Sequence, residues 1–205
     1  MSLARKQQLC LDAIEHSFSM ADAAYGRVIA YCKLDRTTEV QDQVMVLDAW
    51  SFVDVAKRLR SVIVNTPGLV HGPAYEVFLR GTKSLVDLRH YVQHLEDETA
   101  NVAQSGRPIW GSFSWGIFRR DKTGEIRTYV PGRLARTTGI PVMNPAGREI
   151  HDEVDHFEMS VTGTTINLSD TARRITEFRR RFETVLPSAP TRGTGDDAIL
   201  IIELG

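Results

Sequence analysis

The stretch that decides the fold is Ser84–Glu98, SLVDLRHYVQHLEDE. Its apolar residues recur at steps of three and four, which predicts an amphipathic helix with one core-facing stripe: Leu85, Leu88, Val92 and Leu95. Arg89, His90 and His94 lie beside that stripe. Because His90 and His94 are four residues apart, they face the same side one turn apart, and Arg89 lies about 100° from His90. The sequence thus predicts a guanidinium and two imidazoles at the edge of a buried helix face.

Two interpretations of this cluster remain open. In the first, the cluster is structural: the histidines pack beside the core and Arg89 pairs with a carboxylate close in sequence. In the second, it is a functional site that Asp54 or Arg58 orients. Asp54 falls in the apolar segment 50–56, where a carboxylate is costly unless it is paired, and Arg58 follows at the spacing of a helical ion pair. We therefore predict that Asp54 contacts Arg58 or Arg89.

The segment from Arg89 to His94, RHYVQH, resembles the motif of the HEPN superfamily: an arginine, a polar residue, a short spacer and a histidine, late in a helical bundle. The resemblance covers roughly residues 3–103, with residues 169–186 as a further helix. It implies a helical bundle, frequent dimerisation and, in active members, metal-independent RNA cleavage, whereas many other members only bind partners. It makes Arg89, His90 and His94 the expected catalytic residues. The expected partners are RNA, a second copy of the chain, and a protein such as an antitoxin.

RNA cleavage without a metal needs a group that takes the proton of a 2′-hydroxyl and a cation that stabilises charge on the phosphate. Histidine changes its charge near neutral pH, which suits His94 to the proton transfer. Arginine is always cationic and binds two phosphate oxygens at once, which suits Arg89 to the second role. His90 would position the substrate or support His94. The alternative is a non-catalytic bundle that binds a protein partner or nucleic acid through the same polar residues.

The other periodicities predict a mainly α fold: an up-down helical bundle with a small antiparallel sheet inserted before the last helix. Helices are predicted over residues 2–34, 38–64, 74–104 and 169–186. Aromatic and β-branched residues around turn sequences predict two β-hairpins, over 109–130 and 155–168, within an insertion that spans 107–168. We expect one domain over residues 1–186, followed by a linker and a short apolar run in residues 187–205.

The composition is typical of a globular protein and excludes few functions. The chain has 205 residues, of which 42% are hydrophobic and 25% charged, with a formal net charge of -1. This balance gives no overall sign of nucleic-acid binding. Basic residues are nonetheless concentrated in residues 107–136 and 173–181, and the second segment contains five arginines. A local basic surface is therefore expected.

The sequence predicts no metal site and no cofactor, because it has no CxxC pair, no phosphate-binding glycine loop and no nucleophile elbow. The cluster His151–His156, HDEVDH, lacks the spacing of a zinc or calcium site, and we interpret it as a solvated acidic loop. Cys10 and Cys32 lie too far apart on one predicted helix to pair. No signal-peptide run and no stretch of membrane-spanning length is present. We therefore expect a cytoplasmic protein with no membrane partner.

Overall fold

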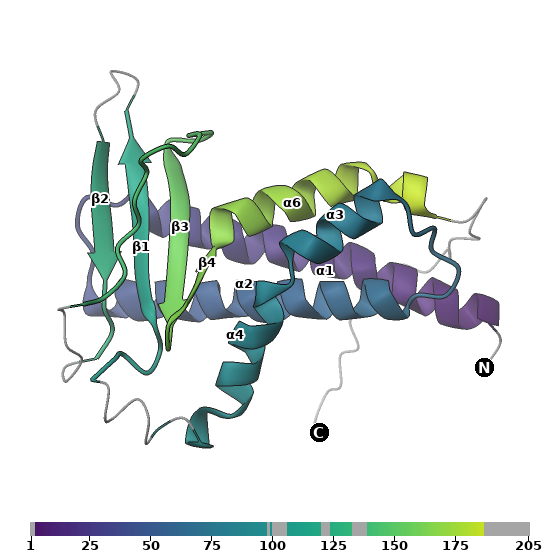
Figure 1. The fold of residues 1–205 in the computed structure, drawn as a ribbon, viewed down its shortest axis with the longest axis horizontal. Helices are drawn as coiled ribbons and strands as arrows, with labels where there is room; N and C mark the ends of the chain where they lie inside the picture. Colours follow the sequence, from purple (N-terminus) through teal and green to yellow (C-terminus); the bar gives the residue numbers. More distant parts are fainter. Residues whose placement is uncertain (1–2, 98, 100–105, 120–123, 133–138, 187–205) are drawn as a thin grey trace, which may run out of the picture.

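The computed structural model describes residues 3–97, 99, 106–119, 124–132 and 139–186. Within this part of the chain the protein is a mixed α+β structure. Two long helices, α1 (Leu3–Cys32) and α2 (Glu39–Asn65), form an antiparallel pair, and an antiparallel sheet stands crosswise at one end of it (Figure 1). The predicted order of helices, antiparallel sheet and final helix is therefore confirmed.

The pairing of α1 with α2 follows from their apolar stripes. On α1 the stripe is buried at Ile14, Phe18, Ala21, Val28 and Cys32. The start of α2 is fixed by a reciprocal capping box, in which the Thr38 hydroxyl accepts from Gln41 N and the Gln41 side chain accepts from Thr38 N. Thr38 is therefore the N-cap of α2.

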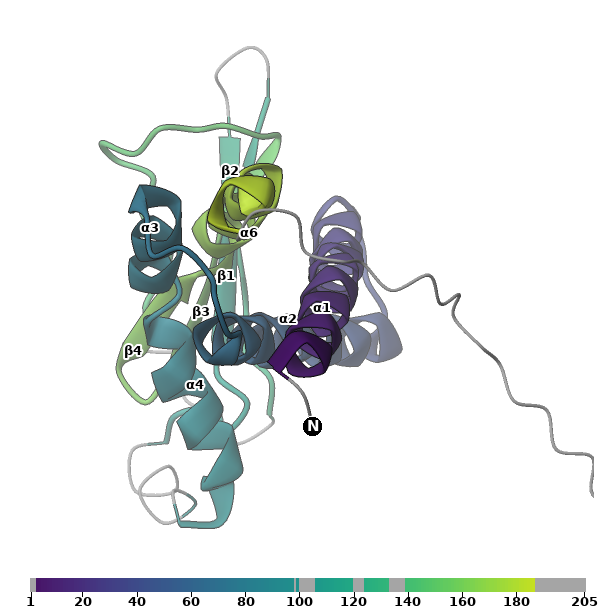
Figure 2. The same cartoon turned by 90° about the vertical axis from the view of Figure 1, so that its right-hand side faces the viewer.

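The predicted third helix, 74–104, is wrong as a single element. It is divided into α3 (Pro73–Gly81) and α4 (Ser84–Gln93). At the break, Arg60 of α2 donates a hydrogen bond of 2.5 Å to the Leu79 carbonyl and one of 3.0 Å to the Thr82 hydroxyl. The Thr82 hydroxyl in turn donates to the Phe78 carbonyl. These bonds satisfy backbone and side-chain groups at the end of α3, so the chain can change direction before α4 (Figure 2).

The sheet joins both predicted hairpins in the order β2-β1-β3-β4. Its strands are β1 (Ser112–Phe118), β2 (Gly124–Tyr129), β3 (Val154–Val161) and β4 (Thr164–Asn167). The central pair, β1 and β3, is antiparallel and almost wholly buried. Between Ser114 and Gly116 the register shifts, so that two residues of β3, His156 and Phe157, lie against one of β1, Trp115. This bulge places His156 at a φ of 53°, which is uncommon for a residue other than glycine.

The last helix, α6 (Leu168–Arg180), packs on α1 and α3, and a short 3₁₀ helix, η1 (Phe182–Val185), follows it. Asn167 caps α6, because its side chain accepts from the Asp170 N–H at 3.0 Å. Phe178 stacks on Phe78 of α3 at a centroid distance of 4.4 Å. One hydrophobic cluster thus joins helices and sheet. The predicted linker and apolar run, 187–205, lie outside the described residues, and the single-domain prediction stays a prediction.

Candidate functional site

The helix that carries the Arg89–His94 motif is held on one side by apolar packing. Leu85 and Leu88 are buried, as the sequence stripe predicts, and α4 contacts α2. Val92 and Leu95 of the predicted stripe are only partly buried, and Tyr91, which was not in it, is buried. At the far end of α4, the Tyr91 hydroxyl donates a hydrogen bond of 2.8 Å to the Ile109 carbonyl. The backbone of the motif is therefore fixed on its inner face, which leaves its outer face to the polar residues.

Arg89 is anchored by a carboxylate from the neighbouring helix. Its Nε donates a hydrogen bond of 2.5 Å to Oδ1 of Asp54. The other oxygen of Asp54 accepts a bond of 2.6 Å from Nε of Arg58, so one carboxylate binds two guanidinium groups. The predicted contact of Asp54 with Arg58 or Arg89 is confirmed, because both are present.

The way Arg89 is held leaves part of its guanidinium available. Its side chain is 21% exposed, whereas that of Arg58 is 66% exposed. Only Nε of Arg89 is engaged by Asp54, and within the described residues neither terminal nitrogen of Arg89 has a hydrogen-bond partner. A guanidinium that is oriented through Nε keeps two parallel N–H donors for an anion, which is the arrangement that binds phosphate or carboxylate oxygens.

His90 and His94 lie together on the outer face of this helix. Their ring centroids are 4.3 Å apart and the rings are tilted by 45°. Both side chains are exposed. The sequence predicts His94 inside a continuous helix, but His94 is the C-cap of α4. Its N–H donates to the His90 carbonyl at 3.1 Å. The one-turn spacing between the two imidazoles is nevertheless retained.

Acidic residues follow the motif directly. The Nδ1 of His94 lies 3.5 Å from Oδ2 of Asp97, a contact that is an ion pair only when the imidazole is protonated. Glu96 and Asp97 are both exposed. Their charges oppose a polyanion at this end of α4, whereas Arg89 favours one.

A second group of polar residues lies at the bulge of β3. The interpretation of the segment His151–His156 as a solvated acidic loop is wrong in part. Asp155 and His156, expected in a solvated loop, are buried on β3. Burial alone would raise the pKa of Asp155, but hydrogen bonds from Arg173 and from the N–H groups of His151 and His156 outweigh it and hold the pKa below its ordinary value. In the described part of the chain, no three metal-ligating side chains gather as a metal site.

Next to Asp155, a chain of hydrogen bonds joins α1 to the sheet. The Tyr25 hydroxyl donates to Ser169 Oγ at 2.8 Å, and the Phe157 N–H donates to the same oxygen at 2.9 Å. Burial raises the pKa of Tyr25, so the phenol stays protonated. Sequence reasoning missed this group because Tyr25 and Ser169 are 144 residues apart and neither belongs to a recognisable motif.

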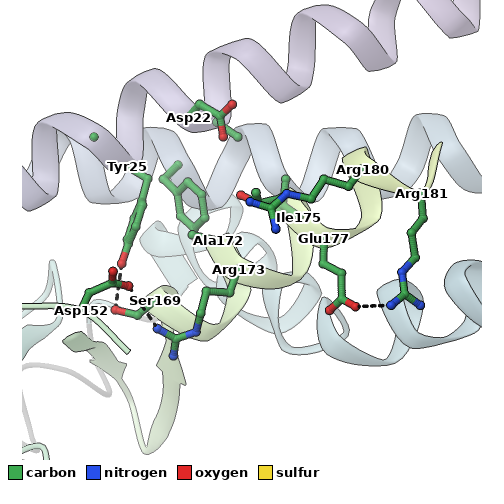
Figure 3. Close-up of a pocket in the computed structure, with 14 residues that line it drawn as sticks. Asp22, Tyr25, Asp152, Ser169, Ala172, Arg173, Ile175, Glu177, Arg180 and Arg181 are labelled. Carbon is green, nitrogen blue, oxygen red and sulfur yellow. Dashed lines mark hydrogen bonds and ion pairs between the residues drawn. The ribbon is translucent and has the colours of Figure 1, made fainter. Parts of the chain in front are cut away.

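Tyr25 and Ser169 also line a cleft of about 730 Å³ between α1 and α6 (Figure 3). Helix α6, which lines the cleft, lies on one side of the α1–α2 pair, whereas α4 extends to the other side (Figure 1). The protein therefore has two separate polar sites, one at Arg89 and one in this cleft.

No protein-family model matches the chain, and no curated protein or solved structure is significantly similar to it. The described helices include none with the length and apolar character needed to cross a bilayer. The function must therefore be inferred from the chemistry of the two sites.

Proposed function

We propose that the protein is a HEPN-like, metal-independent endoribonuclease with Arg89, His90 and His94 at its active site. The observation that carries this proposal is the anchoring of Arg89 by Asp54, which leaves two guanidinium donors on the segment that also carries two imidazoles 4.3 Å apart. A cation oriented toward phosphate and adjacent groups for proton transfer are what such a reaction requires. The proposal includes the finer points of the resemblance: an up-down bundle, a cytoplasmic location and RNA as substrate.

In the proposed reaction, His94 accepts the proton of a 2′-hydroxyl while the 2′-oxygen attacks the adjacent phosphorus. The bond from phosphorus to the 5′-oxygen breaks, and the leaving oxygen takes a proton from protonated His90. Arg89 binds the non-bridging oxygens and stabilises the charge that develops on them. The products are a 2′,3′-cyclic phosphate and a 5′-hydroxyl, so atoms and charge balance without a metal or a bound water.

The exposed position of the two histidines supports assembly of the site in a homodimer. The His94 side chain is 51% exposed, and α4 also carries the exposed apolar side chain of Val86. A second α4 packed against the first would partly exclude water from the imidazoles and Arg89. Electrostatic attraction between Arg89 and a phosphate is stronger in such a lower-dielectric environment.

The test compares variants of the full chain on RNA in the presence of EDTA. His94→Ala and Arg89→Ala are expected to lose at least 100-fold in cleavage rate, which is the range for removal of an acid-base group or a charge-stabilising donor. Gln93→Ala changes an exposed residue of the same helix and should cleave like the wild type. Equal cleavage by all four proteins would mean that the activity belongs to a contaminant or to another site.

The second candidate is a non-catalytic bundle that binds a protein partner, such as an antitoxin, through the same polar residues. It is favoured by Asp97, whose carboxylate lies 3.5 Å from His94 and would compete with RNA phosphate for the protonated ring. On this account the wild type does not cleave RNA in EDTA. Charge reversal at Asp97 also distinguishes the two candidate functions. Asp97→Lys should strengthen RNA binding if RNA is the ligand, and it should weaken binding of a basic protein partner.

A further inference from the structure

Small residues contribute to both walls of the cleft between α1 and α6. Ala21 and Gly26 of α1 face it, as does Ala172 of α6. A Cβ built on Gly26 would meet nothing within 4 Å, so packing does not require glycine there. Glycine lowers the helix propensity in the middle of α1. A larger side chain at position 26 would extend into the cleft.

The charges around the cleft leave one arginine uncompensated. Arg173 is bound by Asp155 at 2.8 Å and by Asp170, and Arg181 is bound by Glu177 at 2.9 Å. Arg180 has no ion-pair or hydrogen-bond partner within the described residues. Figure 3 shows its side chain lying along the cleft. An anionic group in the cleft would therefore be bound by Arg180.

The middle of the cleft offers an aromatic surface that is held in place. The Tyr25 ring packs against Phe52 at a centroid distance of 5.3 Å, and its hydroxyl is fixed by Ser169. Because the phenol stays protonated and its oxygen is engaged, the ring contributes an apolar face to the cleft. A flat apolar group is the natural occupant of such a surface.

The two ends of the cleft differ in chemistry. At the Ser169 end, Asp152 is 69% exposed and lies 3.8 Å from Arg173, so its carboxylate can still accept from a ligand donor. Ser169 and Arg180 lie eleven residues apart on one helix, about 16 Å at the rise of an α-helix. A bare anion would occupy one end only, whereas an elongated ligand can use the acceptor, the aromatic surface and the arginine together.

We propose that this cleft binds a nucleotide whose base carries an exocyclic amino group. The phosphate binds Arg180, the base lies against Tyr25, and its amino group donates to Asp152. The volume of about 730 Å³ lies within the range of small-molecule sites. The proposal is independent of RNA cleavage, because no residue of α4 lines the cleft.

Isothermal titration of the full chain with AMP, UMP, adenosine and inorganic phosphate tests the proposal. AMP is expected to bind at least tenfold more tightly than adenosine, phosphate or UMP, because each of these lacks at least one of the three contacts. Asp152→Asn should reduce the difference in binding affinity between AMP and UMP. No detectable binding of AMP at millimolar concentration, or equal affinity for phosphate and AMP, would overturn the proposal.

Variants at two positions separate binding from folding. Gly26→Leu should abolish AMP binding by filling the cleft, whereas Gly26→Ala should raise the melting temperature and change the affinity by less than threefold. Arg180→Ala should weaken AMP binding at least tenfold. Its matched control is Arg174→Ala, which changes an exposed arginine of α6 that does not line this cleft. Wild-type affinity in Gly26→Leu, or equal losses in Arg180→Ala and Arg174→Ala, would contradict the assignment.

Discussion

Asp54 links α2 to α4, because its Oδ1 accepts a hydrogen bond of 2.5 Å from Nε of Arg89, 35 residues further along the chain. The same carboxylate accepts from Arg58 through its second oxygen. Of the two partners, Arg89 is the less exposed, and it is the one that belongs to the same segment as the histidines. The orientation of the proposed phosphate-binding group therefore depends on Asp54.

Asp54→Ala is expected to lower the free energy of unfolding by roughly 1–2 kcal/mol, because it leaves the half-buried Arg89 without its partner. It should also reduce RNA cleavage at least tenfold, because Arg89 loses its orientation. The control is Arg58→Ala, which removes an exposed ion pair worth about 0–1 kcal/mol and keeps the Asp54–Arg89 bond. Urea denaturation and cleavage rates measure both effects; equal losses in the two variants would refute the special role of the Arg89 contact.

Asp155→Asn should change how the free energy of unfolding depends on pH. The pKa of Asp155 is lowered in the folded protein from the ordinary value of 3.8, so its stabilisation is fully present above pH 4 and is lost as pH falls through the folded value. The variant should be less stable than the wild type by roughly 2 kcal/mol at pH 7, since Arg173 loses a charged partner. That difference should shrink below pH 4. Urea titrations at several pH values measure it, and a constant difference down to pH 2 would contradict the assignment.

Gly111→Ala should destabilise the protein more than Gly147→Ala does. Both glycines have positive φ, 80° and 73°, so alanine carries a similar backbone penalty of about 1–2 kcal/mol at each. At Gly111, however, the new Cβ would lie 2.8 Å from the Ser160 carbonyl oxygen, whereas at Gly147 it would meet nothing within 4 Å. Thermal melts of the two variants isolate the effect of the contact. Equal melting temperatures would show that the start of β1 can shift away from β3.

Self-association through α4 is expected to depend on Val86, which is 41% exposed. Val86→Glu should convert a dimer to a monomer in sedimentation velocity, because it puts a charge in the proposed interface. Val70→Glu alters another exposed valine, outside α4, and should leave the dimer intact. A wild-type chain that sediments only as a monomer at high concentration would remove the support for a shared active site.

The regular elements could be predicted from the sequence because their signals are local. Each signal involves residues only a few positions apart. These signals are the apolar period of α1 and α2, the Thr38 cap and the β-branched pattern of the hairpins. The break between α3 and α4 could not be predicted, because a lone Gly81 is tolerated in a helix and the break is stabilised by Arg60 from α2.

Long-range pairing also explains which contacts of the polar sites the sequence predicts and which it does not. The Asp54–Arg89 contact was predictable as one of two alternatives, since a carboxylate in an apolar segment needs a cation and both Arg58 and Arg89 could supply it. The sequence predicts Asp155 as a solvated residue, because nothing near it in sequence shows that Arg173 pairs with it in the buried sheet. The cleft at Tyr25 depends on the packing of α6 against α1, which periodicity does not define.

The most direct measurement of the central claim is the chemistry of the product ends. The wild-type protein is incubated in EDTA with one oligonucleotide sequence made as RNA and as its 2′-O-methyl form, and the ends are identified by mass spectrometry. The account predicts cleavage of the RNA alone, with 2′,3′-cyclic phosphate and 5′-hydroxyl ends, because His94 must remove a 2′-hydroxyl proton. Intact RNA, cleavage of the 2′-O-methyl form, or 5′-phosphate ends would contradict it.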